Sequence, residues 1–353
     1  MEMTIDQGKL DQFMGTIVGE LGAAMNAALV LIGDRLGLYK AMAGAGPMTA
    51  ADLARKTGTN ERYVHEWLAA QAAGGFVTYD PATESFTLPN EQAFALAVED
   101  SPAYLPGAFQ IISAVVKDTH KIIEAFRTGD GVGWDEHDAA LFEGTERFFR
   151  PNYAAHLISD WIPSLDGVEG RLRKGARVAD VGCGHGASTL LMAQAYPKST
   201  FLGFDYHGPS IGWARRAATR AQVSNATFGV ATAKDFHGSQ YDFVTFFDCL
   251  HDMGDPVGAA KHVRELLSPD GTWMIVEPFA HDRVEENLNP IGRLFYSAST
   301  VICTPASRSQ EVGLGLGAQA GEKRIRQVVD EAGFKHFRRA TETPFNLVYE
   351  ARA

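Results

Sequence analysis

Apolar residues in two parts of the chain recur at spacings of three and four, which predicts amphipathic helices. In the stretch 12–42 they are Phe13, Ile17, Leu21, Met25, Leu29, Ile32, Leu36 and Leu38. In the stretch 100–165 they include Phe109, Ile112, Val116, Ile122, Ile123 and Phe126, with Pro102 and Pro106 as breaks before them. Both stretches are therefore expected to be helical.

The residues between these stretches predict a helix, a turn, a second helix and a hairpin. Thr49 can cap one helix, which Gly58 would end, and Asn60 can cap the next. The segment 76–88 then alternates apolar and polar residues on either side of an Asp-Pro turn. This order predicts a winged-helix domain within residues 20–95.

An aromatic cluster closes the second helical stretch. It consists of Phe142, Phe148, Phe149, Tyr153 and Trp161. Aromatic side chains gathered in this way form either a core or the wall of a ligand pocket. We expect most of them in the core and Tyr153 at a bound ligand.

After Arg177 the pattern changes to short apolar runs that alternate with helical segments. The expected strands are 177–182, 200–205, 226–231, 241–248, 272–278 and two more within 335–350; the expected helices are 187–196, 209–221, 256–267 and 322–333. Such alternation is typical of a parallel α/β sheet, here with seven strands. The glycine-rich run 313–321 is expected to be a loop.

The length of the chain supports two domains, since 353 residues exceed one ordinary compact core. We expect a winged-helix domain used for dimerisation at 1–99, a helical linker and lid at 100–165, and the α/β domain at 166–353.

The charge of the chain argues against nucleic acid and anionic membrane as partners. The formal net charge is −11, whereas proteins bind both surfaces by neutralising phosphates with Lys and Arg. The helix that would enter the major groove carries Glu61 and Glu66, and the hairpin adds Asp80 and Glu84. DNA reading is therefore disfavoured, and a homodimer is the expected use of this domain.

Cysteine usage points to a reducing compartment. Cys183, Cys249 and Cys303 are an odd number without a CxxC pair, so neither a disulfide framework nor a metal site is predicted. The first residues are polar and acidic, unlike a signal peptide, and we expect no 18-residue apolar stretch. A soluble, cytoplasmic protein is the expectation.

The strongest motif is VADVGCGHGAS, at the end of a predicted strand and just before a helix. Its glycines, Gly182, Gly184 and Gly186, let the backbone approach a ligand closely. Asp205 ends the next strand, where a carboxylate can accept both hydroxyls of an adenosine ribose. Dinucleotide fingerprints usually have an apolar residue instead of Asp180, and they need a second nucleotide-binding half that we do not find.

Three segments occur in order: DVGCGHG with Asp205, FDCLHDMGDP, and LLSPDGTWMIVEP. Together they resemble class I S-adenosylmethionine-dependent methyltransferases. More narrowly, the chain resembles the two-domain bacterial members, of mycobacterial type, that carry an amino-terminal winged helix. The resemblance implies a seven-stranded Rossmann-like sheet, S-adenosylmethionine as cofactor, S-adenosylhomocysteine as product and a small-molecule acceptor, with oxygen favoured as the methylated atom.

The same resemblance assigns a set of cofactor-binding residues, from the methionine end to the adenine. They are Asp180, Gly182, Cys183, Gly184 and Gly186 at the methionine part; Asp248 and Cys249 near the sulfonium; Asp205 at the ribose; and Tyr206, Thr232, Ala233, Lys234, Asp235 and Phe236 around the adenine. Tyr153 is a further expected cofactor contact. Thr232 stands where the family often has an acid, so Asp235 is the candidate for the adenine amino group. Cys183 and Cys249 are expected to pack as small residues and not to act as nucleophiles.

The expected catalytic residues follow the fourth and fifth strands of the sheet. His251 and Asp252 stand where related O-methyltransferases carry a His-Asp pair, with the histidine as base, and Glu277 is placed to orient it. The other interpretation of His251 is a helix cap or a contact to the cofactor. Glu322 and Asn346 either line the pocket or cap surface helices. Methyl transfer needs no metal, because the sulfur already activates the carbon.

Two other functions stay open at this point. One is a winged-helix transcriptional regulator whose methyltransferase-like domain senses a ligand. The other, with less support, is an NAD-dependent oxidoreductase.

Overall fold

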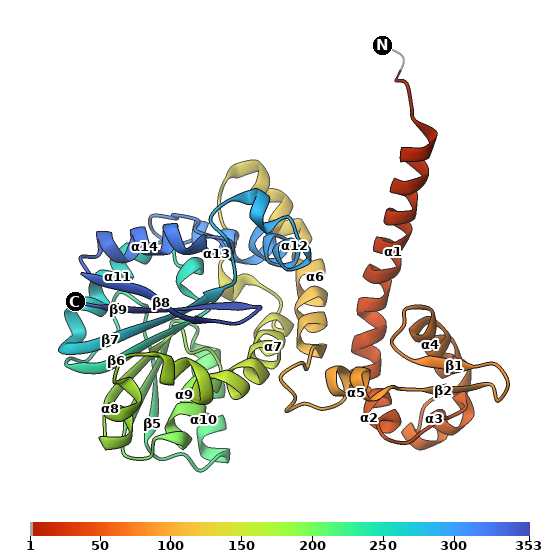
Figure 1. Cartoon of the computed structure of the whole chain (residues 1–353), viewed down its shortest axis with the longest axis horizontal. Helices are drawn as coiled ribbons and strands as arrows, with labels where there is room; N and C mark the ends of the chain where they lie inside the picture. Colours follow the sequence, from red (N-terminus) through yellow and green to blue (C-terminus); the bar gives the residue numbers. More distant parts are fainter. Residues whose placement is uncertain (1–2) are drawn as a thin grey trace. The chain divides into compact units, whose positions relative to one another are not determined.

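The computed structural model describes residues 3–353, and their contacts group into two units. The first unit contains the chain as far as Ser113 together with Glu143–Pro151, and the second contains Ala114–Phe142 and everything from Asn152 onward. Each unit has its own core, and each is described separately below (Figure 1).

The first unit is a winged helix, as predicted. Its elements are α1 (Gln7–Arg35), α2 (Leu38–Met42), α3 (Ala50–Thr57), α4 (Glu61–Ala73), β1 (Thr78–Asp80), β2 (Ser85–Thr87) and α5 (Asn90–Leu96). Thr49 and Asp52 form a reciprocal capping box at the start of α3, Gly58 ends it in the left-handed region, and Asn60 caps α4. The hairpin β1–β2 is antiparallel.

Long-range polar contacts complete this unit. Asp34, near the end of α1, accepts two hydrogen bonds from the Arg147 guanidinium, at 2.8 and 3.0 Å, and one from the Tyr104 hydroxyl. Arg147 belongs to α7 (Ala140–His156), which packs closely against α6 (Pro106–Thr128). A Cβ at Gly107 would lie 2.6 Å from the backbone nitrogen of Phe148, so only glycine fits there.

Helix α1 differs from the sequence expectation in one respect. By length and composition it is apolar enough to cross a membrane, and most of its surface is exposed. Ile17, Val18, Leu21 and the run 29–32 produce most of this character, together with the alanines between them. Glu20 and Asn26 interrupt these residues, so the sequence shows no unbroken apolar run, and the expected absence of an 18-residue apolar stretch was wrong.

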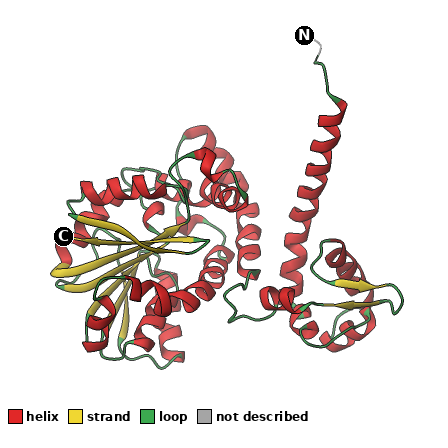
Figure 2. Ribbon diagram, in the orientation of Figure 1, coloured by secondary structure: helices red, strands yellow, loops and turns green. Residues whose placement is uncertain are grey.

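The second unit is a seven-stranded α/β sheet, as predicted (Figure 2). The strands are β3 (Arg177–Val181), β4 (Thr200–Asp205), β5 (Ala226–Val230), β6 (Tyr241–Phe247), β7 (Leu267–Pro278), β8 (His336–Glu342) and β9 (Asn346–Arg352), in the order β5-β4-β3-β6-β7-β9-β8. Helices α8 (Val168–Lys174), α9 (Ala187–Ala195) and α10 (Gly208–Arg220) lie on one face, and α11 (Pro256–Leu266) and α14 (Gly321–Glu331) on the other.

One strand departs from the expected parallel arrangement. Strand β9 runs antiparallel to both β7 and β8. Only the short turn 343–345 joins β8 to β9, and a connection of that length cannot bring the chain back for a parallel pairing. The sheet is therefore mixed.

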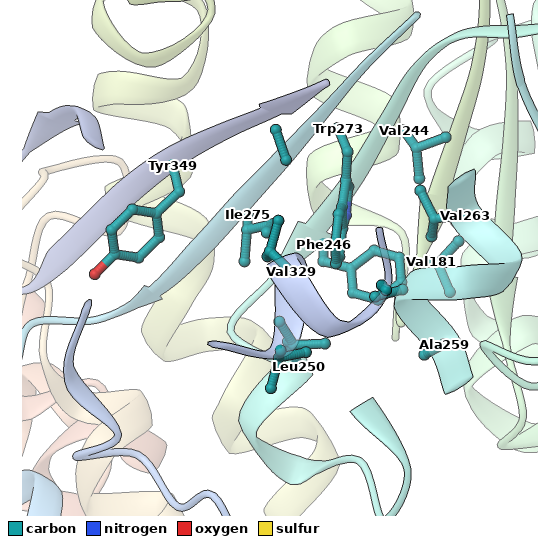
Figure 3. Packing of buried hydrophobic residues seen from close by; sticks show 14 of the residues in the cluster. Val181, Val244, Phe246, Leu250, Ala259, Val263, Trp273, Ile275, Val329 and Tyr349 are labelled. Carbon is teal, nitrogen blue, oxygen red and sulfur yellow. The ribbon is translucent and has the colours of Figure 1, made fainter. Parts of the chain in front are cut away.

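The core of this unit lies between the sheet and helices α11 and α14. Trp273 packs edge to face against Phe246, with ring centroids 5.0 Å apart, and Val263 and Val329 are fully buried beside them (Figure 3). The smaller elements of this unit are short 3-10 turns at Trp134–Glu136, Ile162–Ser164, Leu250–Asp252 and Val284–Asn287; π-helical turns at Leu157–Trp161 and Ser299–Cys303; and helices α12 (Pro290–Ala298) and α13 (Thr304–Arg308). As predicted, residues 313–320 form a loop.

Candidate functional site

Strand order sets the place of the site. The chain turns from β3 outward to β4 and β5, then returns to β6 on the other side of β3. A crevice opens at such a reversal, beyond the carboxyl ends of the parallel strands, and ligands of open α/β sheets bind there. The predicted residues Asp180, Asp205, Asp248 and Glu277 all lie at or near these strand ends.

The glycine loop has a left-handed backbone at each of its three glycines. Gly182, Gly184 and Gly186 all have positive φ angles, of 73°, 52° and 83°. A Cβ at Gly182 would lie 2.7 Å from Cys249 Sγ. The loop leads into α9 (Ala187–Ala195), with Gly186 at its N-cap. A Cβ would therefore clash at Gly182 and, against Phe228, at Gly186, whereas Gly184 has open space around it and only its left-handed φ favours glycine.

Asp180 is buried and bonded entirely to hydroxyl groups. One oxygen accepts from Ser188 Oγ (2.7 Å) and Thr189 Oγ1 (2.5 Å), and the other accepts from Thr245 Oγ1 (3.0 Å). Burial raises its pKa to about 6, although the three hydrogen bonds oppose that shift. Asp180 thus fixes the start of α9 to the sheet directly beneath the glycine loop.

Asp205 ties the glycine loop to the end of β4. Its carboxylate accepts from the Gly184 N–H at 2.9 Å and from the His207 N–H at 2.8 Å. Burial raises its pKa, and these two backbone hydrogen bonds lower it. The neighbouring Tyr206 is partly exposed, and burial of its hydroxyl raises the pKa of that group.

Residues 232–236, the predicted adenine contacts, form a tight turn after β5. Their side chains differ in burial and in the partners that they bind. Asp235 accepts from the backbone N–H and the hydroxyl of Thr232, at 2.6 and 2.7 Å, so one of its oxygens closes the turn. Lys234 forms ion pairs with Asp255 and Glu311. Phe236 is buried in the core, and Ala233 is half-buried beside it.

Asp248 follows β6 directly and holds an unusual position. Its φ of 49° is in the left-handed region, which few residues other than glycine adopt. One carboxylate oxygen accepts from the Tyr153 hydroxyl (2.8 Å) and the other from the Asn346 amide (2.9 Å). Burial, and then the charge of Glu277, raise the pKa of Asp248 to about 7. Tyr153 is thereby held at the carboxyl end of the central strand β6.

His251 and Glu277 form a buried pair. His251 Nδ1 lies 2.6 Å from Glu277 Oε2, while the other Glu277 oxygen accepts the Leu250 N–H at 3.1 Å. His251 Nε2 lies 3.2 Å from Asp252 Oδ1. Burial lowers the pKa of the imidazole, but the charges of Asp252 and Glu277 outweigh burial and raise it well above its usual value.

The cysteines of the site are packed thiols. Burial, reinforced by nearby carboxylates, raises the pKa of Cys183 and of Cys249 well above the usual value for a thiol. Both groups are therefore protonated near neutral pH, as their expected packing role requires.

Several residues of the site carried little or no signal in the sequence. Asn346 was noted only as a candidate for the pocket or a surface cap, and it donates to Asp248. Glu322 instead pairs with Arg326 and Arg339. Cys303 lies beside His251 and Asp252, although it is about fifty positions away along the chain. Contacts that distant leave no local pattern to detect.

Two family models match the chain. Residues 24–98 match an Rv2258c-like winged HTH domain, and residues 172–333 match a methyltransferase domain. This chain is a two-domain protein with a class I methyltransferase fold. The matched methyltransferase domain contains the glycine loop, Asp205, Asp248, His251 and Glu277 described above.

One relative is similar in sequence to part of the chain. A ubiquinone biosynthesis O-methyltransferase from Bordetella avium is 31% identical over 160 residues, which are 44% of this chain and 61% of that relative. The chain therefore spans about three fifths of that relative's length.

Solved structures resemble the chain over nearly its whole length. A human N-acetylserotonin methyltransferase in complex with S-adenosylmethionine has a TM-score of 0.72 at 14% identity, covering 100% of this chain and 99% of its own. The mitomycin 7-O-methyltransferase has a TM-score of 0.71 at 18% identity, covering 99% and 100%. At these identities the likeness establishes the shared fold.

Proposed function

We propose that this protein transfers a methyl group from S-adenosylmethionine to an oxygen atom of a small-molecule acceptor. The observation that carries this proposal is the His251–Glu277 hydrogen bond of 2.6 Å, at the sheet edge where the glycine loop and Asp205 also lie. The matched methyltransferase domain and the S-adenosylmethionine complex of the human relative support the choice of cofactor.

The electrostatics of the methyltransferase domain favour a cationic ligand. Asp180, Asp205 and Asp248 are bonded to hydroxyl, backbone N–H and side-chain amide groups, all of them neutral. Burial raises the pKa of each of these carboxyl groups. A ligand that brings positive charge to this edge would stabilise the carboxylates, and the sulfonium and amino groups of S-adenosylmethionine are positive.

We propose the following roles along the glycine edge. Asp205 accepts the ribose hydroxyls with the lone pairs that remain beyond its two backbone hydrogen bonds. Gly182, Cys183, Gly184 and Gly186 border the methionine part, supported from beneath by Asp180. Asp248, Cys249 and Tyr153 lie at the sulfonium, and Tyr206 and residues 232–235 border the adenine, whereas Phe236 supports that turn from the core.

The proposed chemistry is an in-line displacement in which the protein aligns the reactants and moves one proton. S-adenosylmethionine supplies a methyl carbon activated by its positive sulfur. His251 Nδ1 donates to Glu277, which leaves Nε2 to accept the proton of the acceptor hydroxyl as its oxygen attacks. The electrons of the broken carbon–sulfur bond stay on sulfur. Asp252 and Glu277 stabilise the imidazolium that forms.

Calorimetry with S-adenosylmethionine, its demethylated product and NAD tests the cofactor assignment. We expect micromolar or tighter binding of the first two. Mass spectrometry of a panel of phenols and other hydroxylated acceptors then tests methyl transfer. Heat with NAD but with neither adenosyl ligand would refute the proposal.

We further propose that the winged helix serves assembly and does not read DNA. Helix α4 exposes Glu61, Arg62, His65 and Glu66, and its only arginine is paired with Glu66. Such a surface has little positive charge to offer phosphates. A gel-shift assay against random and genomic duplexes is the test, and salt-sensitive retention of DNA would favour the regulator instead.

Helix α1 provides the surface for a homodimer. Its exposed apolar residues follow the heptad-like spacing of one stripe: Leu10, Met14, Val18, Leu21, Met25 and Ile32. A second copy of the same helix is a partner that would cover this stripe. The three free thiols fit the cytoplasm, which we propose as the location of the protein.

Light scattering on two charge-matched variants tests this homodimer. Leu21→Glu places a charge in the stripe and should yield monomers. Ala23→Glu adds the same charge at an exposed position on the opposite side of α1 and should leave the dimer intact. A monomeric wild-type chain at micromolar concentration would contradict the proposal.

A further inference from the structure

Three side chains with metal-ligand chemistry converge beside the proposed base. His251, Asp252 and Cys303 each offer one donor atom, and these atoms lie within 4.8 Å of one another. We propose that they form a site for a thiophilic divalent cation such as Zn²⁺. All three residues belong to the second unit, so the site is complete within it.

The hydrogen bonding of His251 directs Nε2 toward the other two donors. Nδ1 is engaged with Glu277, while Nε2 lies 3.2 Å from Asp252 Oδ1 and the imidazole is hydrogen-bonded to the Cys303 side chain, a contact that a metal would replace. Histidines that bind metals usually donate their other N–H to a carboxylate, which fixes the ring orientation and the tautomer. Glu277 provides that second contact.

Asp252 supplies an independent indication of a ligand. Its Oδ1 atom is buried and has no hydrogen-bond partner within the described part of the chain. Its contact with the imidazole is close, but the geometry is not that of a hydrogen bond. A buried carboxylate oxygen without a hydrogen bond is costly, and a cation between Asp252, His251 and Cys303 would give Oδ1 a ligand bond in place of its ion-pair contact with the imidazole.

The donor set itself favours a soft or borderline metal. Thiolate, imidazole and carboxylate are the ligands that Zn²⁺ takes in proteins, and three of them with one open position are typical of its non-structural sites. In a tetrahedral Zn²⁺ centre, donor atoms lie roughly 3.3–3.6 Å apart, as follows from its bond lengths. The widest separation, up to 4.8 Å, therefore needs to contract by up to roughly 1.2–1.5 Å.

The segments that carry the donors are fixed to each other. Ser307 Oγ donates to the Met253 carbonyl at 2.8 Å, and Gln310 Nε2 donates to the Asp252 carbonyl at 2.9 Å. These hydrogen bonds connect the His251–Asp252 turn to α13, immediately after Cys303. Cys303 ends a π-helical turn, and such turns often occur at functional sites.

Metal binding would deprotonate Cys303 and would also interfere with the proposed reaction. The Cys303 thiol would lose its proton to solvent as the metal–sulfur bond forms. The metal would also occupy His251 Nε2, the atom assigned above to the acceptor proton. We therefore expect Zn²⁺ to inhibit methyl transfer, a consequence that rests on the proposed function, whereas the binding itself does not.

Cobalt titration of the full-length, chelator-treated chain tests the binding. Co²⁺ should give thiolate-to-cobalt charge-transfer absorption that saturates at one ion per chain and disappears when Zn²⁺ is added. Cys303→Ser should abolish this absorption. Cys183→Ser, which removes another buried thiol, should retain it. Asp252→Asn should weaken Co²⁺ binding at least tenfold.

Two results would overturn the metal site: no charge-transfer absorption in the wild-type chain, or unchanged absorption in folded Cys303→Ser. If that variant does not fold, peptide mapping of alkylation in the wild-type chain replaces it, and Zn²⁺ should protect Cys303 selectively. Unprotected Cys303 would also refute the site. Because these readouts need no methyl acceptor, they remain valid if the proposed transferase activity fails.

Discussion

Replacing Asp248 with asparagine should stabilise the ligand-free protein while weakening its cofactor binding. Asparagine is among the few residues that tolerate the left-handed φ of 49° at this position. It also keeps an acceptor for the Asn346 amide and a polar partner for Tyr153. The substitution therefore removes the negative charge with little change in shape.

The raised pKa of Asp248 gives the size and sign of the effect. A shift from 3.8 to about 7 corresponds to roughly 4 kcal/mol of unfavourable free energy for the charged form in the folded state. Below about pH 4 the group is protonated in both states, and this cost is absent. It grows as the pH rises from 4 to 7. Imperfect pairing of the new amide costs about 1–2 kcal/mol, so we expect a net gain of roughly 2 kcal/mol above pH 7.

Chemical denaturation of wild-type and Asp248→Asn chains between pH 4 and 8 measures the difference. The variant should have no stability advantage over wild type near pH 4, and its advantage should grow as the pH rises to 8. In thermal melts with S-adenosylmethionine the order should reverse, because the cation then stabilises only the wild-type carboxylate. A difference that does not depend on pH, or a variant less stable at pH 8, would refute the reasoning.

Three further substitutions test the rest of the site. Asp205→Ala should cost about 2–4 kcal/mol of cofactor affinity by calorimetry, since charge-assisted hydrogen bonds are lost; unchanged affinity in the folded variant would remove Asp205 from the ribose site. Gly182→Ala should destabilise the domain by about 1–3 kcal/mol in chemical denaturation, because its φ is positive and the new Cβ would clash with Cys249. Gly184→Ala should cost less, because no atom lies close to that position. His251→Ala should lower the transfer rate roughly 100- to 10,000-fold and spare cofactor affinity, and the wild-type rate should rise with pH beyond neutrality because the imidazole pKa is raised. If affinity and rate fall together, His251 is a binding residue.

Features with a local sequence signal were predictable. The caps Thr49 and Asn60, the period-two strands and the glycine loop each follow from residues close together in the chain. Features that depend on distant residues were not. The reversed direction of β9 depends on the short turn before it, which the strand pattern does not reveal.

The same reason separates the predicted from the missed site residues. His251 and Asp252 lie within one motif. Cys303, which lies beside them, and Asn346, which donates to Asp248, come from other elements. For Asp235 the partner is close in sequence. Its carboxylate accepts hydrogen bonds from Thr232, three residues before it, and these local bonds compete with the predicted contact to a ligand.

The first unit is discontinuous in the chain, and this affects how it can form during synthesis. Asp34 is held by Arg147, which follows a stretch of nearly thirty residues that belongs to the other unit. A ribosome must therefore release residues beyond Pro151 before the winged helix can complete its contacts, long before most of the sheet has emerged. A nascent chain stopped at Ser113 would lack Arg147 and leave Asp34 with the Tyr104 hydroxyl but without its cationic partner, and it should be more accessible to proteases and chaperones than the finished unit.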